Sequence, residues 1–82
     1  MNYRLEFKPR AIRDLKNIQS ADRARILSNI EKLSDDLAGD VKRLTNFTPE
    51  FRLRVGKNRV LFEVERDRVI IYRVIHRKDA YR

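Results

Sequence analysis

The fold is decided by residues 51–59, which read FRLRVGKNR. Apolar residues alternate with Arg52 and Arg54, and this period of two is typical of a strand with one buried face and one exposed face. The next three residues, GKN, interrupt the alternation as the loop of a hairpin does. The stretch therefore predicts a strand, a three-residue loop and a second strand that opens at Arg59, with arginines gathered on the exposed face.

The N-terminal half predicts one strand and two helices. Residues 3–7 (YRLEF) again alternate apolar and charged side chains, which indicates a first strand. Apolar residues spaced by three and four positions predict a helix from Pro9 to about Ile18. The same spacing predicts a second helix from Ser20, its expected N-cap, to a stop at Gly39.

The segments around the hairpin complete the order of elements. Residues 40–50 are expected to be irregular, with Leu44 and Phe47 against the core. After the hairpin, residues 66–68 (RDR) predict a second tight turn. Residues 69–75 (VIIYRVI) form the most apolar run of the chain, which predicts a strand in the interior of the sheet.

The predicted fold is an α+β two-layer sandwich with the order β-α-α-β-β-β. Short connections predict antiparallel pairing for the last three strands and a hairpin for the two helices. The helices must cover one face of the sheet to bury their apolar stripes. The position of the first strand in the sheet stays open. We expect one domain, residues 1–82, because a chain of 82 residues has room for one modest core.

Basic residues outnumber acidic ones, and the excess is uneven along the chain. The sequence has 20 lysines and arginines against 12 aspartates and glutamates, a net charge of +8. Residues 1–50 carry ten basic and eight acidic side chains, and residues 51–82 carry ten basic and four acidic ones, so +6 lies in the C-terminal half. This predicts a polyanionic partner, either nucleic acid or an acidic protein segment. The alternative is a charge that only keeps a small protein soluble.

Several classes of site are excluded by the residue types. Cysteine is absent, which excludes disulfides and thiolate metal sites and agrees with a cytoplasmic location. The charged N-terminus is unlike a signal peptide, and no segment has the roughly 20 apolar residues of a membrane span. Asp35, Asp36 and Asp40 are expected in a solvated helix end and loop, and His76 is the single histidine, so we expect no metal. Two glycines cannot form a Gly-rich phosphate loop, and no cofactor is expected.

The remaining candidates form a cationic cluster at the hairpin and the tail. Its members are Arg52, Arg54, Lys57, Arg59, His76, Arg77, Lys78 and Tyr81. Such a cluster could cleave RNA without a metal, because the 2′-OH is an internal nucleophile and arginines can stabilise the charge of the transition state. His76 has a suitable intrinsic pKa for proton transfer, whereas Tyr81 is a weaker proton carrier.

Each candidate also has a purely structural alternative. Arg54 or Arg59 could pair with Glu63 or Glu65 across the hairpin, and His76 could be a plain surface residue. The ring of the C-terminal tyrosine could simply pack on the last strand. Spacing alone thus predicts a basic α+β module that binds a polyanion, with catalysis left open.

The sequence resembles the RelE/ParE toxin superfamily over essentially its whole length. The resemblance is carried by LTNFTPEFRLRVGKNRVLFEV and VIIYRVIHRKDAYR, and by the opening YRLEFKPRAIRDLKNI. For the RelE branch it implies a toxin that cuts mRNA in the ribosomal A site by 2′-OH attack, without metal, leaving a cyclic phosphate. It also implies an acidic RelB-like antitoxin that covers the basic face, and operator DNA contacted only through that antitoxin.

The resemblance implies a role for each candidate residue. Phosphate-binding positions fall on Arg52, Arg54, Lys57 and Lys78. Catalytic positions fall on Arg59, His76, Arg77 and Tyr81, with Tyr81 orienting the RNA. His76 and Arg77 compete for one tail position, and an Arg-Arg pair where some members have lysines favours an electrostatic role. Two alternatives remain: a ParE-like inhibitor of DNA gyrase and a non-catalytic basic binding module.

Overall fold

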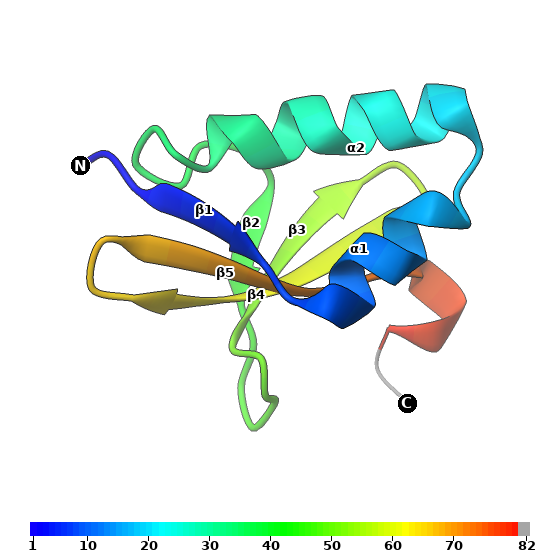
Figure 1. Cartoon of the computed structure of the whole chain (residues 1–82). Coiled ribbons are helices and arrows are strands. Elements are labelled where there is room, and N and C mark those ends of the chain that lie inside the picture. Colours follow the sequence, from blue (N-terminus) through cyan, green and yellow to red (C-terminus); the bar gives the residue numbers. More distant parts are fainter. Residues whose placement is uncertain (81–82) are drawn as a thin grey trace.

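The computed structural model describes residues 1–80 and places two helices over one face of a five-stranded sheet (Figure 1). The elements are β1 (Arg4–Phe7), α1 (Pro9–Lys16), α2 (Ser20–Lys32), β2 (Val41–Arg43), β3 (Phe51–Val55), β4 (Asn58–Glu65), β5 (Arg68–His76) and the 3-10 helix η1 (Arg77–Asp79). The strand order is β1-β5-β4-β3-β2. β1 runs parallel to β5, and the other neighbours are antiparallel. The α+β fold, the three-strand meander and the interior position of β5 are therefore confirmed.

The hairpin of β3 and β4 is tighter than predicted. Val55 pairs with Asn58, so the loop holds only Gly56 and Lys57 rather than three residues. Gly56 has φ of +59°, and a glycine at the first of two turn positions suits the twist of a hairpin. Arg54 consequently lies directly opposite Arg59 across the two strands.

Two predictions for the first half were wrong, namely the end of the second helix and the irregular conformation of all of residues 40–50. α1 ends at Lys16, and α2 ends at Lys32 rather than near Gly39, because turns follow at residues 33–34 and again at Asp36 and Leu37, where φ is positive. Residues 41–43 form the edge strand β2 on β3, in a segment expected to be irregular. Three residues are too few to show the period of a strand in the sequence. β2 is a strand only because it pairs with β3.

The core lies between the helices and the sheet. Ala11 and Leu15 of α1 pack there with Ile26 and Ile30 of α2. The sheet contributes Leu53, Val55, Val60, Phe62, Val69, Ile71 and Val74. The expectation that Phe47 packs against the core was wrong, because 41% of this residue is exposed. No helix in the described part of the chain has the length and apolarity that a membrane crossing requires.

One ion pair fixes α1 to the sheet. The Asp14 carboxylate accepts hydrogen bonds from Nε (2.8 Å) and Nη2 (3.3 Å) of Arg73 and from the backbone N–H of Val74 (3.0 Å). These bonds lie beside an irregularity in the β4–β5 register, where Tyr72 has no partner in the pairing. Asp14 thereby satisfies a backbone donor at a place where the sheet ladder is interrupted.

Candidate functional site

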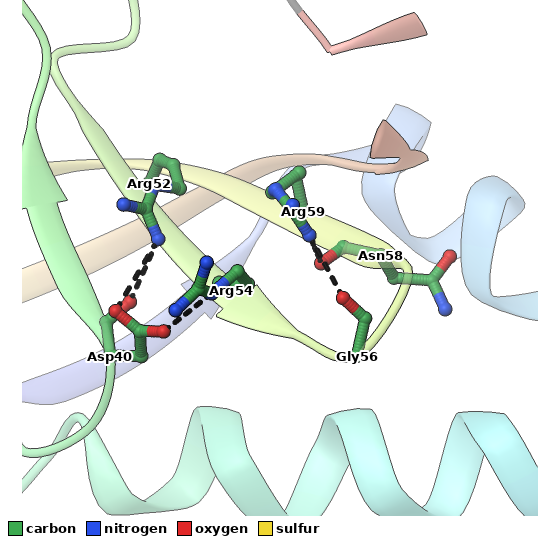
Figure 2. Close-up of polar contacts among 6 residues, drawn as sticks. All are labelled: Asp40, Arg52, Arg54, Gly56, Asn58 and Arg59. Atoms are coloured by element: carbon green, nitrogen blue, oxygen red, sulfur yellow. Dashed lines mark hydrogen bonds and ion pairs between the residues drawn. The ribbon is translucent and has the colours of Figure 1, made fainter. Parts of the chain in front are cut away.

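Arg52 and Arg54 share one carboxylate, that of Asp40 (Figure 2). Nε of Arg54 donates to Oδ2 of Asp40 at 2.6 Å, and Nη1 of Arg52 lies 3.5 Å from Oδ1. The carbonyl oxygen of Asp40 also accepts from Nη1 of Arg52 (3.3 Å) and from the backbone N–H of Arg54 (3.0 Å). The Arg52 side chain is only 12% exposed, whereas that of Arg54 is 55% exposed. Arg54 therefore offers the more accessible charge.

The electrostatics of this group differ from those expected of two free arginines. The hydrogen bond from Arg54, helped by the charges of Arg54 and Arg52, lowers the pKa of Asp40 below its ordinary value of 3.8. Asp40 is thus ionised at neutral pH, and the three side chains together carry a charge of +1. The alternative in which Arg54 pairs with Glu63 or Glu65 was wrong.

The two glutamates of β4 have other partners. Glu63 accepts from the backbone N–H of Glu50 at 2.8 Å, and Glu65 lies 3.5 Å from Arg68. The counter-ion of Arg54 instead comes from the loop before β2, which was predicted to be merely solvated. Asp40 is 14 residues from Arg54 in the sequence, so the spacing of neighbouring residues could not predict this pair.

Arg59 keeps its charge unneutralised within the described residues. Its Nη1 donates to the carbonyl oxygens of Gly56 and Asn58, each at 3.0 Å, so the side chain folds back over the turn (Figure 2). Carbonyl acceptors orient a guanidinium without cancelling its charge. The alternative in which Arg59 pairs with a glutamate of β4 was also wrong.

The tail is attached to the same turn by its backbone. The N–H of Arg77 donates to the carbonyl oxygen of Lys57 at 2.8 Å, directly after the strand pair Asn58–His76. Nδ1 of His76 accepts from the N–H of Lys78 at 3.2 Å and so caps η1. A neutral imidazole that accepts at Nδ1 carries its proton on Nε2, so it can donate from that atom but not accept there.

The candidate residues thus divide between two sides of the hairpin. Because Leu53, Val55 and Val60 face the core, their neighbours Arg52, Arg54 and Arg59 point to the face away from the helices. The other group faces α2, where Lys57 and Arg77 line a cavity together with Arg25. Lys78 is exposed on η1, and Tyr81 lies outside the described residues.

Two residues of this region were missed by the sequence analysis. Arg25 is one of several cations on the exposed face of α2, and only the fold brings it to the turn. Asp40 was noticed but was not connected with the arginines. Among residues 1–80, no three His, Asp or Glu side chains gather closely enough to hold a metal ion.

The chain is similar to toxins of known toxin–antitoxin systems. The family model of the ParE toxin of type II toxin–antitoxin systems (parDE) matches residues 5–81. Toxin RelE3 of Methanocaldococcus jannaschii is 36% identical over 75 residues, which cover 85% of each chain.

Solved structures show the same likeness in three dimensions. A chain of the RelB–RelE antitoxin–toxin complex from Methanococcus jannaschii superposes with a TM-score of 0.76 and 32% identity, over 93% of this chain and 94% of that one. A chain of the RelBE2 toxin–antitoxin complex from Mycobacterium tuberculosis gives a TM-score of 0.80 and 27% identity, over 94% and 100%. The likeness therefore extends over nearly the whole fold.

Proposed function

Because the chain belongs to the RelE/ParE superfamily of toxins from toxin–antitoxin pairs, we propose that it is an endoribonuclease that cuts mRNA in the ribosomal A site. The observation that carries this proposal is the arrangement of cations around one two-residue turn. Arg59 folds over the turn, Lys57 is part of it, and Arg77 is bonded to its backbone. An RNA strand crossing the turn would meet charge on both sides of the hairpin.

The proposed reaction uses the RNA as its own nucleophile. The 2′-oxygen forms a bond to phosphorus as its proton leaves, and the bond from phosphorus to the 5′-oxygen breaks as that oxygen gains a proton. The products are a 2′,3′-cyclic phosphate and a free 5′-hydroxyl. Arg59 and Arg77 would stabilise the added negative charge of the phosphorane-like transition state. Arg52, Arg54, Lys57 and Lys78 would hold neighbouring phosphates, and Tyr81 would orient the strand.

The geometry favours Arg77 over His76 for the tail position. His76 uses Nδ1 to cap η1, so it acts as a positioning residue for the tail that carries Arg77. Arginine holds its proton at all accessible pH values, so Arg77 acts as a fixed positive charge. Proton transfer is then left to the ribosome, to water or to the Nε2–H of His76 as a donor.

The partner that we propose is an acidic, RelB-like antitoxin that covers the basic face and blocks it. The support is the net charge of +8 and the likeness to toxins solved in complexes with their antitoxins. Contact with operator DNA would be made by the antitoxin. Toxin, ribosome and antitoxin would meet in the cytoplasm.

The second candidate is inhibition of DNA gyrase, and the match of the ParE family model is what favours it. Two assays distinguish the nuclease from the gyrase inhibitor. In the first, the protein is added to ribosomes that hold a defined codon in the A site, and the new RNA ends are mapped. In the second, supercoiling by gyrase is measured in parallel. Cleavage within the codon that is lost in Arg77→Ala supports the nuclease. Poisoned gyrase with intact mRNA would overturn it, and inactivity in both assays would leave only a binding module.

A further inference from the structure

A cavity of 390 Å³ lies between α2 and the β3–β4 turn, on the helix side of the sheet. Three cations line it, namely Arg25 of α2, Lys57 of the turn and Arg77 of η1. Asp22 and Asn58 also line the cavity. Its volume falls within the range of about 300 to 1,000 Å³ that is usual for small-molecule sites.

The three cations of this cavity have no carboxylate partner among residues 1–80. Some arginines elsewhere do pair closely with a carboxylate, as Arg73 does with Asp14 and Arg54 with Asp40. None of the ion pairs within 4.0 Å includes Arg25, Lys57 or Arg77. Like charges that converge raise the free energy of the empty site, and a bound anion would offset this repulsion.

The turn itself brings these cations together. A Cβ atom on Gly56 would lie 3.3 Å from Nη1 of Arg25, so the guanidinium rests directly against the turn where a side chain is absent. On the other side, the Lys57 carbonyl oxygen holds the N–H of Arg77 at 2.8 Å. Arg25, far from the tail in sequence, is thereby placed at the same turn as Arg77.

We infer that this cavity binds one nucleotide of a single-stranded RNA, with its phosphate between Arg25 and Lys57, while Arg77 serves the adjoining scissile phosphate. The inference rests on the proposed function, since the nucleotide would be a neighbour of the scissile one. The mixed wall favours a nucleotide over an acidic peptide. Asp22 and the side-chain carbonyl of Asn58 can accept hydrogen bonds from sugar hydroxyls and base amino groups, whereas the carboxylate side chains of an acidic peptide have no hydrogen to donate to them.

The test measures binding by the isolated protein, without ribosomes. AMP, inorganic phosphate and a non-cleavable 2′-O-methyl oligonucleotide are titrated into ¹⁵N-labelled protein. We expect saturable shifts of the amide signals of Gly56, Lys57 and Arg77, with tighter binding of AMP than of phosphate. Arg25→Gln should weaken AMP and oligonucleotide binding about tenfold, as expected for one lost charge-assisted contact. The slope of log K against log salt should fall by about 0.7 for the oligonucleotide.

Arg13→Gln is the matched control, because Arg13 is an exposed arginine in the last turn of α1 and the substitution removes the same charge. Its affinity for AMP should equal that of the unmodified protein, and thermal unfolding of both variants checks the fold. Equal affinity of Arg25→Gln and Arg13→Gln for AMP would overturn the inference. So would equal affinity of the unmodified protein for phosphate and AMP. Absence of ribosomal cleavage with AMP binding intact would refute the nuclease and keep the nucleotide site.

Discussion

Oδ2 of Asp40 lies 2.6 Å from Nε of Arg54, so the more accessible arginine of β3 already has an internal anion. The bond is short and charge-assisted, but both side chains are about half exposed, so water and salt weaken it. An incoming phosphate must compete with the Asp40 carboxylate for Arg54. Asp40 therefore reduces the attraction of the face away from the helices for a polyanion.

Replacing Asp40 by Asn should tighten the binding of a non-cleavable single-stranded RNA. The charge of the group formed with Arg52 and Arg54 rises from +1 to +2, so affinity should increase about threefold and the salt dependence should steepen by about 0.7. Fluorescence anisotropy over a salt series measures both quantities. Asp67→Asn removes an equal charge from the exposed pair with Arg4 and should change neither. Weaker binding by Asp40→Asn would mean that Asp40 mainly orients the arginines.

The stability contribution of Asp40 should depend on pH in the acid range. Its pKa is lower in the folded protein than the ordinary 3.8, so the unfolded chain takes up the proton first as the pH falls. The contribution is complete above 3.8 and is lost as the pH falls through the lowered folded value. Thermal unfolding of the unmodified protein and of Asp40→Asn should differ at neutral pH and converge as the pH falls through the lowered folded value. A difference that does not change with pH would contradict the ion pair.

Asp14→Ala should lower the free energy of unfolding by about 2 kcal/mol. The substitution leaves the Arg73 guanidinium unpaired and the Val74 N–H without its acceptor, at a place where the Asp14 side chain is only 14% exposed. Urea unfolding gives the difference directly. Glu31→Ala, on an exposed position of α2, provides the comparison and should stay within about 0.5 kcal/mol. Similar values for both variants would show that the α1–β5 bridge contributes little.

His76→Asn should retain most of the ribosomal cleavage rate, whereas His76→Ala should lose several-fold. Asn can cap η1 by accepting from the N–H of Lys78 as His76 does, but Ala cannot, and the loss of a cap costs about 1 kcal/mol. Cleavage at saturating ribosome concentration compares the two variants. If Asn is as damaging as Ala, His76 transfers a proton and is more than a cap for the tail that carries Arg77.

Local pattern was sufficient for the order and type of most elements. The alternation around Arg52 and Arg54 predicted β3, the three-and-four spacing predicted both helices, and the apolar run of residues 69–75 predicted an interior strand. These features depend on residues that are close in sequence. The alternation of buried and exposed side chains can therefore be read from the sequence itself. The short strand β2 was missed because three residues show no clear alternation, and only the pairing with β3 makes them a strand.

What the sequence by itself determined is a basic α+β domain with arginines on a hairpin, because charge and period are local properties. Only the tertiary structure decided which cations remain available. It brought Asp40 to Arg54 and placed Arg25 beside the turn that holds Arg77. Such pairings join residues that are far apart in the chain, and their strength depends on distances of a few ångströms that only the packed fold sets.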